Sequence, residues 1–263
     1  MTETQVPAEW KNYDDFAAGI ATHRLPASQA LEGRDVAVTF EDGRRLHLRF
    51  ASKGELNWSD ERRNGKDKCD VVCVAAETYF VDIAFSSLPA EAETLILNVA
   101  TGRVLSIRSI VREAGAFPGE PRVAQMFRAG TLDGVDVSGS LAPAATRDLI
   151  GLRAHYTYSP NHVYEHTYLS SQRYAWQCLV GVQRGHGDVD LTTTYKFAED
   201  QYVFTFREFM IPVASTFFYN FADMRSTGKF LGVTGAGVVE NSPAGALIRK
   251  VSMSYYLPGQ EPV

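Results

Sequence analysis

The side chains most suited to chemistry gather in one stretch of the chain, between Leu152 and Tyr195. This stretch holds four of the six histidines and many of the tyrosines, most densely in AHYTYSPNHVYEHTYLSSQRYAWQC. Phenol and imidazole groups combine an aromatic surface with a polar tip. Together they suit an aromatic or heterocyclic ligand, whose ring stacks while a few polar groups orient it.

The pattern in this stretch is that of β-strands, in which alternate side chains share a face. One face then carries Tyr164, His166 and Tyr168. If such faces point into a barrel, the expected ligand-binding residues are Tyr164, Tyr168, Trp176 and Tyr195. The alternative is that some of these tyrosines lie outside the barrel or at a subunit contact, as in a homodimer.

Acid–base chemistry is the second possibility. Arg207 and Glu208 end the aromatic segment YVFTFREF and, as neighbours on a strand, point to opposite faces. An inward Arg207 would hold a carboxylate or phosphate, whereas an inward Glu208 would have its pKa raised by desolvation and could act as an acid or base. His166, with an ordinary pKa of about 6.5, could exchange a proton near neutral pH. The expected catalytic residues are Tyr156, Tyr158, His166, Arg207 and Glu208.

Metal and disulfide chemistry find little support in the spacing of the ligating residues. His162 and His166 are spaced as a helical metal pair, but on a strand they lie about 13 Å apart and cannot hold one ion. Cys69 and Cys73 are equally far apart, beyond the roughly 7 Å that a disulfide spans. No CxxC or zinc spacing occurs. We expect no metal, no cofactor and reduced cysteines.

The composition argues against several classes of partner. With 26 Lys and Arg against 31 Asp and Glu, the formal charge of −5 disfavours nucleic acid and anionic membranes. No apolar run is long enough to span a bilayer, and the opening MTETQVPAEWKNYDD is unlike a signal peptide. These features predict a cytoplasmic protein whose partner is a small molecule.

Short strands must position the chemical groups. From Leu31 onward, period-two segments recur at regular spacing, with turns such as Glu41-Asp42-Gly43 and no long helical pattern between them. Before them, AEWKNYDDFAAGI follows Pro7 and has apolar residues at helical spacing. The expected fold is all-β with one short N-terminal helix that closes one end of a barrel.

Two halves of the chain repeat one order of features, which includes an apolar strand ending in Asn98 or Asn220. Duplication would match these two residues, and Gly102 with Gly228. We expect two tandem antiparallel β-barrels of the lipocalin or calycin type. Their bounds would be 1–130 with the leading helix, a linker at 131–146, and 147–263. A single extended sandwich is the alternative. The larger polar–aromatic cavity should lie in the second unit, because the first supplies mainly small and aliphatic residues.

Three segments resemble the family of molybdenum cofactor biosynthesis protein F (MoaF): GRDVAVTFEDGRRLHLRF, RDLIGLRAHYTYSPNHVYEHTYLSSQRYAWQCLVGVQRGHGDVDL and YKFAEDQYVFTFREFMIPVAS. The resemblance covers nearly the whole chain. It implies two lipocalin-like MoaF domains and a link to molybdenum cofactor synthesis, but it transfers no catalytic motif.

Three functions are compatible with these features. The first is a small-molecule-binding barrel whose aromatic or heterocyclic ligand, pterin-related in view of the resemblance, lies in the second unit. The second is a cofactor-independent lyase, decarboxylase or isomerase for a phenolic-type substrate. The third is an assembly protein that uses the aromatic second barrel as an interface. The residues leave open whether the protein is an enzyme.

Overall fold

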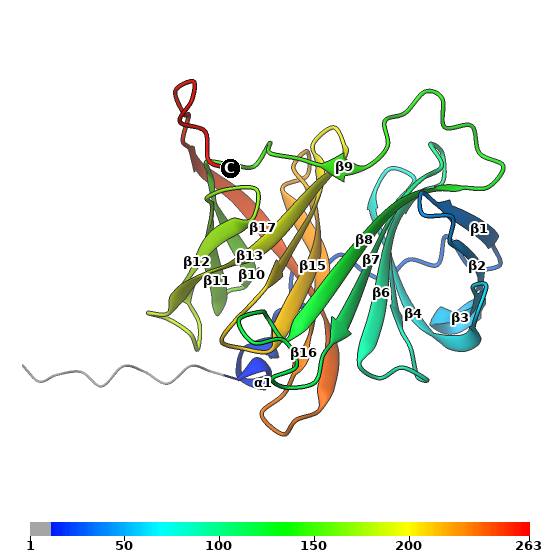
Figure 1. The fold of residues 1–263 in the computed structure, drawn as a ribbon, viewed down its shortest axis with the longest axis horizontal. Helices are drawn as coiled ribbons and strands as arrows, with labels where there is room; N and C mark the ends of the chain where they lie inside the picture. The colour runs from blue at the N-terminus through cyan, green and yellow to red at the C-terminus, as the bar shows by residue number, and fades with distance from the viewer. Residues whose placement is uncertain (1–11) are drawn as a thin grey trace, which may run out of the picture.

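The computed structural model describes residues 12–263, which form two closed antiparallel β-barrels, each of eight strands, lying next to one another (Figure 1). The expected tandem barrels are therefore confirmed, and the sandwich alternative is wrong. The strands of the first barrel are β1 (Asp35–Phe40), β2 (Arg45–Phe50), β3 (Glu55–Ser59), β4 (Asn64–Ala75), β5 (Thr78–Ala84), β6 (Glu91–Asn98), β7 (Arg103–Val111) and β8 (Val123–Leu132). Pairing of β8 with β1 closes it.

The second barrel follows a linker that contains the short strand β9 (Ala144–Ala145). Its strands are β10 (Leu152–Ser159), β11 (His162–Tyr168), β12 (Arg173–Val180), β13 (Gly187–Ala198), β14 (Gln201–Arg207), β15 (Val213–Asn220), β16 (Arg225–Val233) and β17 (Val239–Met253). Pairing of β10 with β17 joins its two ends, and β12 with β13 completes the ring. A 3₁₀ turn, η1 (Ser52–Gly54), lies between β2 and β3.

Equivalent turns in the two barrels support the duplication. The side-chain oxygens of Asn98 and Asn220 each accept two backbone N–H groups of the turn that follows. Gly102 ends the first of these turns with φ 69°, and Met224 ends the second with φ 51°. The expected match of Gly102 with Gly228 is therefore wrong. Gly228 lies inside β16, where an added Cβ would stand 2.5 Å from a carbon of the Phe217 ring.

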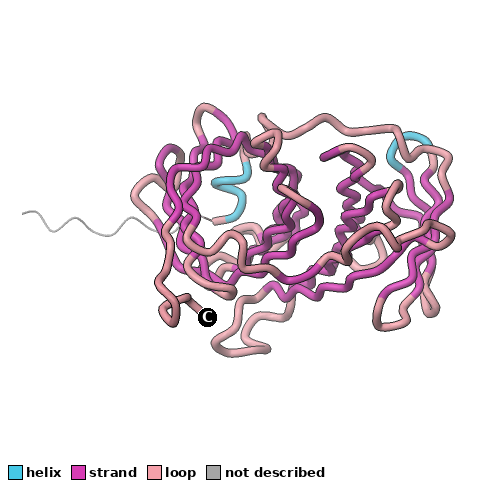
Figure 2. The backbone as a smooth tube through the Cα atoms, turned by 90° about the horizontal axis from the view of Figure 1, so that it is seen from above, coloured by secondary structure: helices cyan, strands magenta, loops and turns pink. Residues whose placement is uncertain are grey.

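The N-terminal helix α1 (Tyr13–Ala17) packs on the second barrel, although it precedes the first barrel in sequence. The Tyr13 hydroxyl donates to the carbonyl oxygen of Phe230 (3.1 Å), and the Phe16 ring meets the Phe230 ring edge-on (5.7 Å). Seen from above, the helix lies within the ring of the second barrel (Figure 2). It thus closes one barrel end, as expected, but Pro7 and Trp10 lie outside the described residues.

The outer faces of the two barrels bury a shared apolar layer, which fixes one barrel against the other. Val72, Phe80 and Ile96 contribute from the first barrel, and Phe197, Val203 and Phe218 from the second. An ion pair between Asp82 and Lys229 crosses the same junction. Thr94 and Asn241 also donate hydrogen bonds to Asp82 (2.9 and 2.6 Å).

The interior of the first barrel is filled by aliphatic and aromatic side chains. A buried ionic network closes one of its ends. Arg44 holds both oxygens of the Glu93 carboxylate (2.6 and 2.9 Å), while Arg108 and Ser106 also donate to that carboxylate. Between residues 12 and 263, no helix has the length and hydropathy needed to cross a membrane.

Candidate functional site

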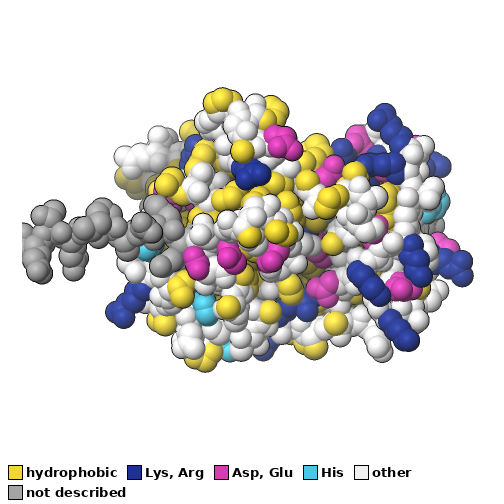
Figure 3. All heavy atoms as spheres, turned by 90° about the horizontal axis from the view of Figure 1, so that it is seen from below, with side chains coloured by type: hydrophobic (Ala, Val, Ile, Leu, Met, Phe, Trp, Pro, Cys, Tyr) yellow, Lys and Arg dark blue, Asp and Glu magenta, His cyan; other side chains and the backbone are white. Residues whose placement is uncertain are grey.

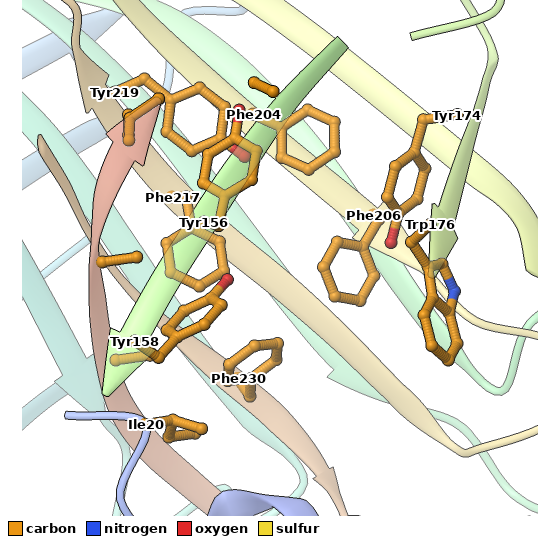
Figure 4. Packing of buried hydrophobic residues seen from close by; sticks show 14 of the residues in the cluster. Ile20, Tyr156, Tyr158, Tyr174, Trp176, Phe204, Phe206, Phe217, Tyr219 and Phe230 are labelled. Carbon is orange, nitrogen blue, oxygen red and sulfur yellow. The ribbon is translucent and has the colours of Figure 1, made fainter. Parts of the chain in front are cut away.

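The second barrel contains a cavity of about 30 Å³, called here the lumen cavity. Its lining comes from α1, β10, β11, β12, β14, β16 and the loop between β12 and β13. The lining residues are Phe16, Ile20, Tyr158, Tyr164, His166, Tyr174, Trp176, Gln183, Phe206, Glu208 and Phe230. Figure 4 shows Tyr174, Trp176 and Phe206 on one side of this region, and Tyr158, Phe230 and Ile20 on the other.

A tryptophan–aspartate pair in each barrel makes the two interiors directly comparable. The indole N–H of Trp58 donates to Asp67 (2.7 Å), and that of Trp176 donates to Asp190 (2.9 Å). Both aspartates also accept a backbone N–H from the residue two positions beyond β5 or β14. These two Trp–Asp pairs therefore serve as reference points from which the strands of the two barrels can be aligned residue by residue.

The matched positions differ consistently in polarity. Apolar side chains of the first barrel are replaced by aromatic rings with polar tips or by a charged group in the second. From the pairing registers, the matched pairs are Phe40 with Tyr158, Leu46 with Tyr164, Leu48 with His166, Leu56 with Tyr174, and Phe85 with Glu208. Two barrels of one topology thus have different interiors, one that fills its own space and one that presents hydrogen-bonding groups to a cavity.

Glu208 is the most costly of these replacements. In the first barrel, Phe85 packs edge-on against Trp58, with ring centroids 4.9 Å apart. Glu208 occupies the matching position and is 8% exposed. Burial, followed by the nearby carboxylates of Asp190 and Asp188, raises the pKa of Glu208 well above its ordinary value. Burial of a carboxyl group costs stability, and strongly shifted pKa values cluster at functional sites, so Glu208 makes the lumen cavity the candidate site.

The other polar groups of the lumen cavity include a neutral histidine. The Tyr164 hydroxyl donates to the side-chain oxygen of Gln183 (2.8 Å). His166 is buried, and its Nδ1 has no hydrogen-bond partner among residues 12–263. Burial lowers the pKa of His166 to about 3. This shift argues against the expected proton exchange by His166 near neutral pH, because the enclosed site penalises the imidazolium form.

We predict that His166 stays neutral from pH 5 to pH 8. The reason is that its folded-state pKa lies far below the ordinary value of 6.5. A ¹⁵N-detected NMR titration of the imidazole, assigned with a His166→Gln variant, measures this directly. Constant chemical shifts are expected, and a midpoint near neutral pH would show that water or counter-charge reaches the ring.

Two of the expected site tyrosines lie deeper in the barrel, away from the lumen cavity. The hydroxyl groups of Tyr156 and Tyr168 are 2.6 Å apart, and the Tyr168 hydroxyl donates to that of Tyr219 (3.3 Å). All three side chains are almost completely buried. Their phenols satisfy one another, which indicates a structural role at the closed end of the lumen.

Two other expected site residues lie outside the barrel interior, which corrects their assignment. Arg207 points toward the junction between the barrels, where it donates to Gln125 (3.2 Å) and Thr193 (3.1 Å). Tyr195 stacks on Phe127, with ring centroids 5.3 Å apart. In both cases the strand register places the side chain on the outer face. Of the adjacent pair at the end of β14, only Glu208 looks inward.

The sequence missed several lining residues. Tyr174 shares a strand face with Trp176, so the alternation could have identified it. Gln183 belongs to a loop, where no periodicity indicates direction. Phe16 and Ile20 precede the first barrel, and only the tertiary packing brings them to the second. Most tyrosines of the second barrel point inward or into the barrel junction, which leaves the assembly alternative with little aromatic surface on these strands.

A much larger hollow than the lumen cavity belongs to the first barrel. It is an open groove of about 600 Å³ at the end closed by the ionic network. Lys and Arg side chains gather at this end of the molecule (Figure 3). The arginines Arg44, Arg108 and Arg128 in this groove already pair with carboxylates. The polar–aromatic cavity lies in the second barrel, but the expectation that it is the larger cavity is wrong, because it is far smaller than this groove.

The side chains within residues 12–263 include no group of three or more His, Cys, Asp or Glu placed to hold a metal ion. His155 and Glu165 do form a hydrogen bond (2.9 Å), on the outer face of the second barrel. Arg249 donates to the other ring nitrogen of His155 (2.8 Å), and Arg153 pairs with Glu165 (2.7 Å). This cluster is a surface network between neighbouring strands.

Comparison with known proteins places both barrels in one family. Residues 8–113 match the MoaF N-terminal domain, and residues 143–254 match the MoaF C-terminal domain. Protein MoaF of Klebsiella aerogenes is 40% identical over 122 residues, a match that covers 46% of this chain and about half (47%) of that protein. A crystal structure described as a putative beta-lactamase from Burkholderia vietnamiensis aligns with a TM-score of 0.34 and 14% identity, over 39% of this chain and 95% of that one.

The structural likeness is too low to carry an argument about fold or function. The two domain matches, in contrast, occur in the order of the two barrels and together span most of the chain. Because both halves match consecutive domains of a single family, the chain belongs to the MoaF family.

Proposed function

We propose that this protein binds a small aromatic or heterocyclic molecule in the lumen of its second barrel. The observation that carries the proposal is the matched set of interior positions, at which Phe85 and its apolar neighbours give way to Glu208, His166 and tyrosines. A closed eight-stranded barrel can hold one small ligand. Aromatic walls with a few convergent polar groups are typical of such sites.

Entry of a ring-sized ligand requires α1 to move. The lumen cavity of about 30 Å³ holds at most a few waters, each of which needs roughly 10–15 Å³. Phe16 and Ile20 cover it from the α1 side. The helix has only five residues and is held at this end by hydrogen bonds such as that from the Gly235 N–H to Asp14 (2.8 Å). Its withdrawal would join the cavity to solvent.

Membership of the MoaF family suggests which class of ligand the lumen binds. The association of MoaF with molybdenum cofactor synthesis favours a pterin-related molecule, whose flat ring bears hydrogen-bonding groups along its edge. Glu208 and Gln183 could meet such an edge while Tyr164 and Trp176 stack on the ring.

The three free cysteines, Cys69, Cys73 and Cys178, fit a reducing cytoplasm.

A second candidate function is acid catalysis, for a lyase, decarboxylase or isomerase acting on a phenolic-type substrate. The specific observation is that Glu208 has a strongly raised pKa beside the phenols of Tyr164 and Tyr174. A carboxylic acid that stays protonated at neutral pH can donate a proton to a bound substrate. Turnover of phenolic acids, followed by chromatography, separates this function from simple binding.

Ligand binding should be visible as thermal stabilisation that depends on Glu208. Pterins and phenolic acids form the first panel. A binder at 100 times its Kd stabilises the fold by about 2.7 kcal/mol, which is roughly 5 to 10 °C for a chain of this size.

Glu208→Phe, which installs the residue of the first barrel, is expected to abolish the shift because the ring fills the cavity. The control Glu113→Phe changes an exposed loop residue and should keep the shift. An unchanged shift in Glu208→Phe would place the binding site elsewhere.

A further inference from the structure

The lumen cavity contains an acidic group and no permanent cation. None of its described lining residues is Lys or Arg. His166 is uncharged at neutral pH, since burial lowers its pKa to about 3. Burial and the carboxylates of Asp190 and Asp188, rather than a nearby cation, set the pKa of the Glu208 carboxyl group. The chain thus buries a carboxyl group without supplying its counter-ion.

The groups around Glu208 add to the negative potential. From β13, Asp190 and Asp188 act on it with the same sign of charge. The phenols of Tyr164 and Tyr174, from β11 and β12, stay neutral and add no charge, because burial and, to a smaller extent, Glu208 raise their pKa values. The lining side chains of α1 and β16 carry no charge.

The nearest arginines act from outside the lumen. Arg207 lies on the outer face of β14. The Arg173 guanidinium stands over the Phe209 ring (5.5 Å), and its charge favours ionised Asp190 rather than Glu208. Neither arginine lines the cavity.

The aromatic side chains that line the cavity, like the Glu208 carboxyl group, favour a positively charged ligand. The faces of Tyr, Trp and Phe rings carry partial negative charge and attract cations, most strongly where water is excluded. Besides Phe16 of α1, six lining side chains carry such rings: Tyr158, Tyr164, Tyr174, Trp176, Phe206 and Phe230. An anion here would face electron-rich rings and find no positively charged side chain, whereas a cation would supply a counter-ion for the Glu208 carboxylate.

We propose that the ligand of the lumen cavity carries a positive charge on or beside its ring, as an aromatic amine, an amidine or a protonated nitrogen heterocycle does. Phosphate and carboxylate groups are disfavoured in the lumen, because none of its described lining residues is Lys or Arg. This inference rests on the proposed binding function and adds the charge of the ligand to it.

The proton balance of binding follows from Glu208. In the empty site the protonated form of the carboxyl group is favoured, because burial and the nearby carboxylates of Asp190 and Asp188 raise its pKa well above the ordinary value. When a cation binds, the carboxyl O–H proton passes to solvent and the carboxylate pairs with the cation, with no covalent bond made or broken. Affinity for a cation should therefore rise with pH until Glu208 is ionised in the free protein.

Three probes that share one ring test the proposal: benzylamine as the cation, benzyl alcohol as the neutral molecule and benzoate as the anion. Calorimetry of the full chain in two buffers of different ionisation enthalpy gives the affinity and the proton release. Benzylamine should bind at least about tenfold more tightly than benzyl alcohol and release about one proton. Glu208→Gln should lose the preference for benzylamine over benzyl alcohol, whereas the control Glu113→Gln should keep it.

The outcomes separate this inference from the binding function on which it rests. Equal affinity for all three probes, or a preference for benzoate, would overturn the inference and leave a ring-binding lumen. Binding of benzylamine that Glu208→Gln does not weaken would place the cation elsewhere and overturn it as well. Failure of the whole series to bind would overturn both.

Discussion

Glu208→Gln is expected to stabilise the protein at neutral pH, by an amount that grows as the pH rises. The folded-state pKa of Glu208 lies well above the 4.5 of an unperturbed glutamate, because the side chain is buried beside Asp190 and Asp188. Its contribution to stability is fully present below pH 4.5 and is lost as the pH rises through the folded pKa. Glutamine has nearly the same side-chain shape as glutamate but has no titratable group.

The difference in unfolding free energy between the two proteins should therefore increase by up to about 1.4 kcal/mol per pH unit over that window. Urea denaturation at intervals from pH 5 to pH 8 measures it. The control Glu113→Gln should follow the parent protein at every pH. Parallel stability curves for Glu208→Gln and the parent would mean that the carboxyl group is not desolvated in the folded state.

Lys229→Met should cause the largest loss of stability outside the barrel interiors. Lys229 pairs with Asp82 at the junction of the two barrels, where both side chains are less than 10% exposed (3% and 9%). Removal of the lysine leaves Asp82 with neutral donors only, Thr94 and Asn241. Breaking a buried pair in this way costs about 3 to 5 kcal/mol.

Chemical denaturation of matched variants checks this. Lys66→Met breaks a pair with Glu55 in which the side chains are 60% and 35% exposed, and it should cost far less, because solvent screens the pair. The double variant Lys229→Met with Asp82→Asn should recover much of the loss, because no buried charge is left alone. Equal costs for Lys229→Met and Lys66→Met would show that water reaches the junction.

The barrels could be predicted from the sequence because strands and turns depend on local patterns. Period-two alternation and the Asn98 and Asn220 turns identified two units of the same topology. The match of Gly102 with Gly228 failed, because residue type alone did not distinguish a turn glycine from one that makes room for Phe217. Identical geometry at Gly102 and Met224 can be seen only in the backbone.

The site could be predicted only in part, since it depends on which strand face turns inward. Alternation correctly placed Tyr164 and His166 on one lumen face, and it limited the end of β14 to one inward residue. The register of β14 with its neighbours decides that Glu208 rather than Arg207 faces the lumen. The closing side of the cavity could not be predicted, because the amphipathic pattern of α1 does not say which barrel it covers.

The central claim is that the ligand lies in the second barrel, between the aromatic walls and Glu208. A crystal structure of the protein with the compound that raises its melting temperature most would test it directly. The ring is expected beside Tyr174, Trp176 and Glu208, with Phe16 and Ile20 displaced from their present positions in the lumen lining. A ligand found instead in the arginine-lined groove of the first barrel, with α1 unmoved, would contradict this account.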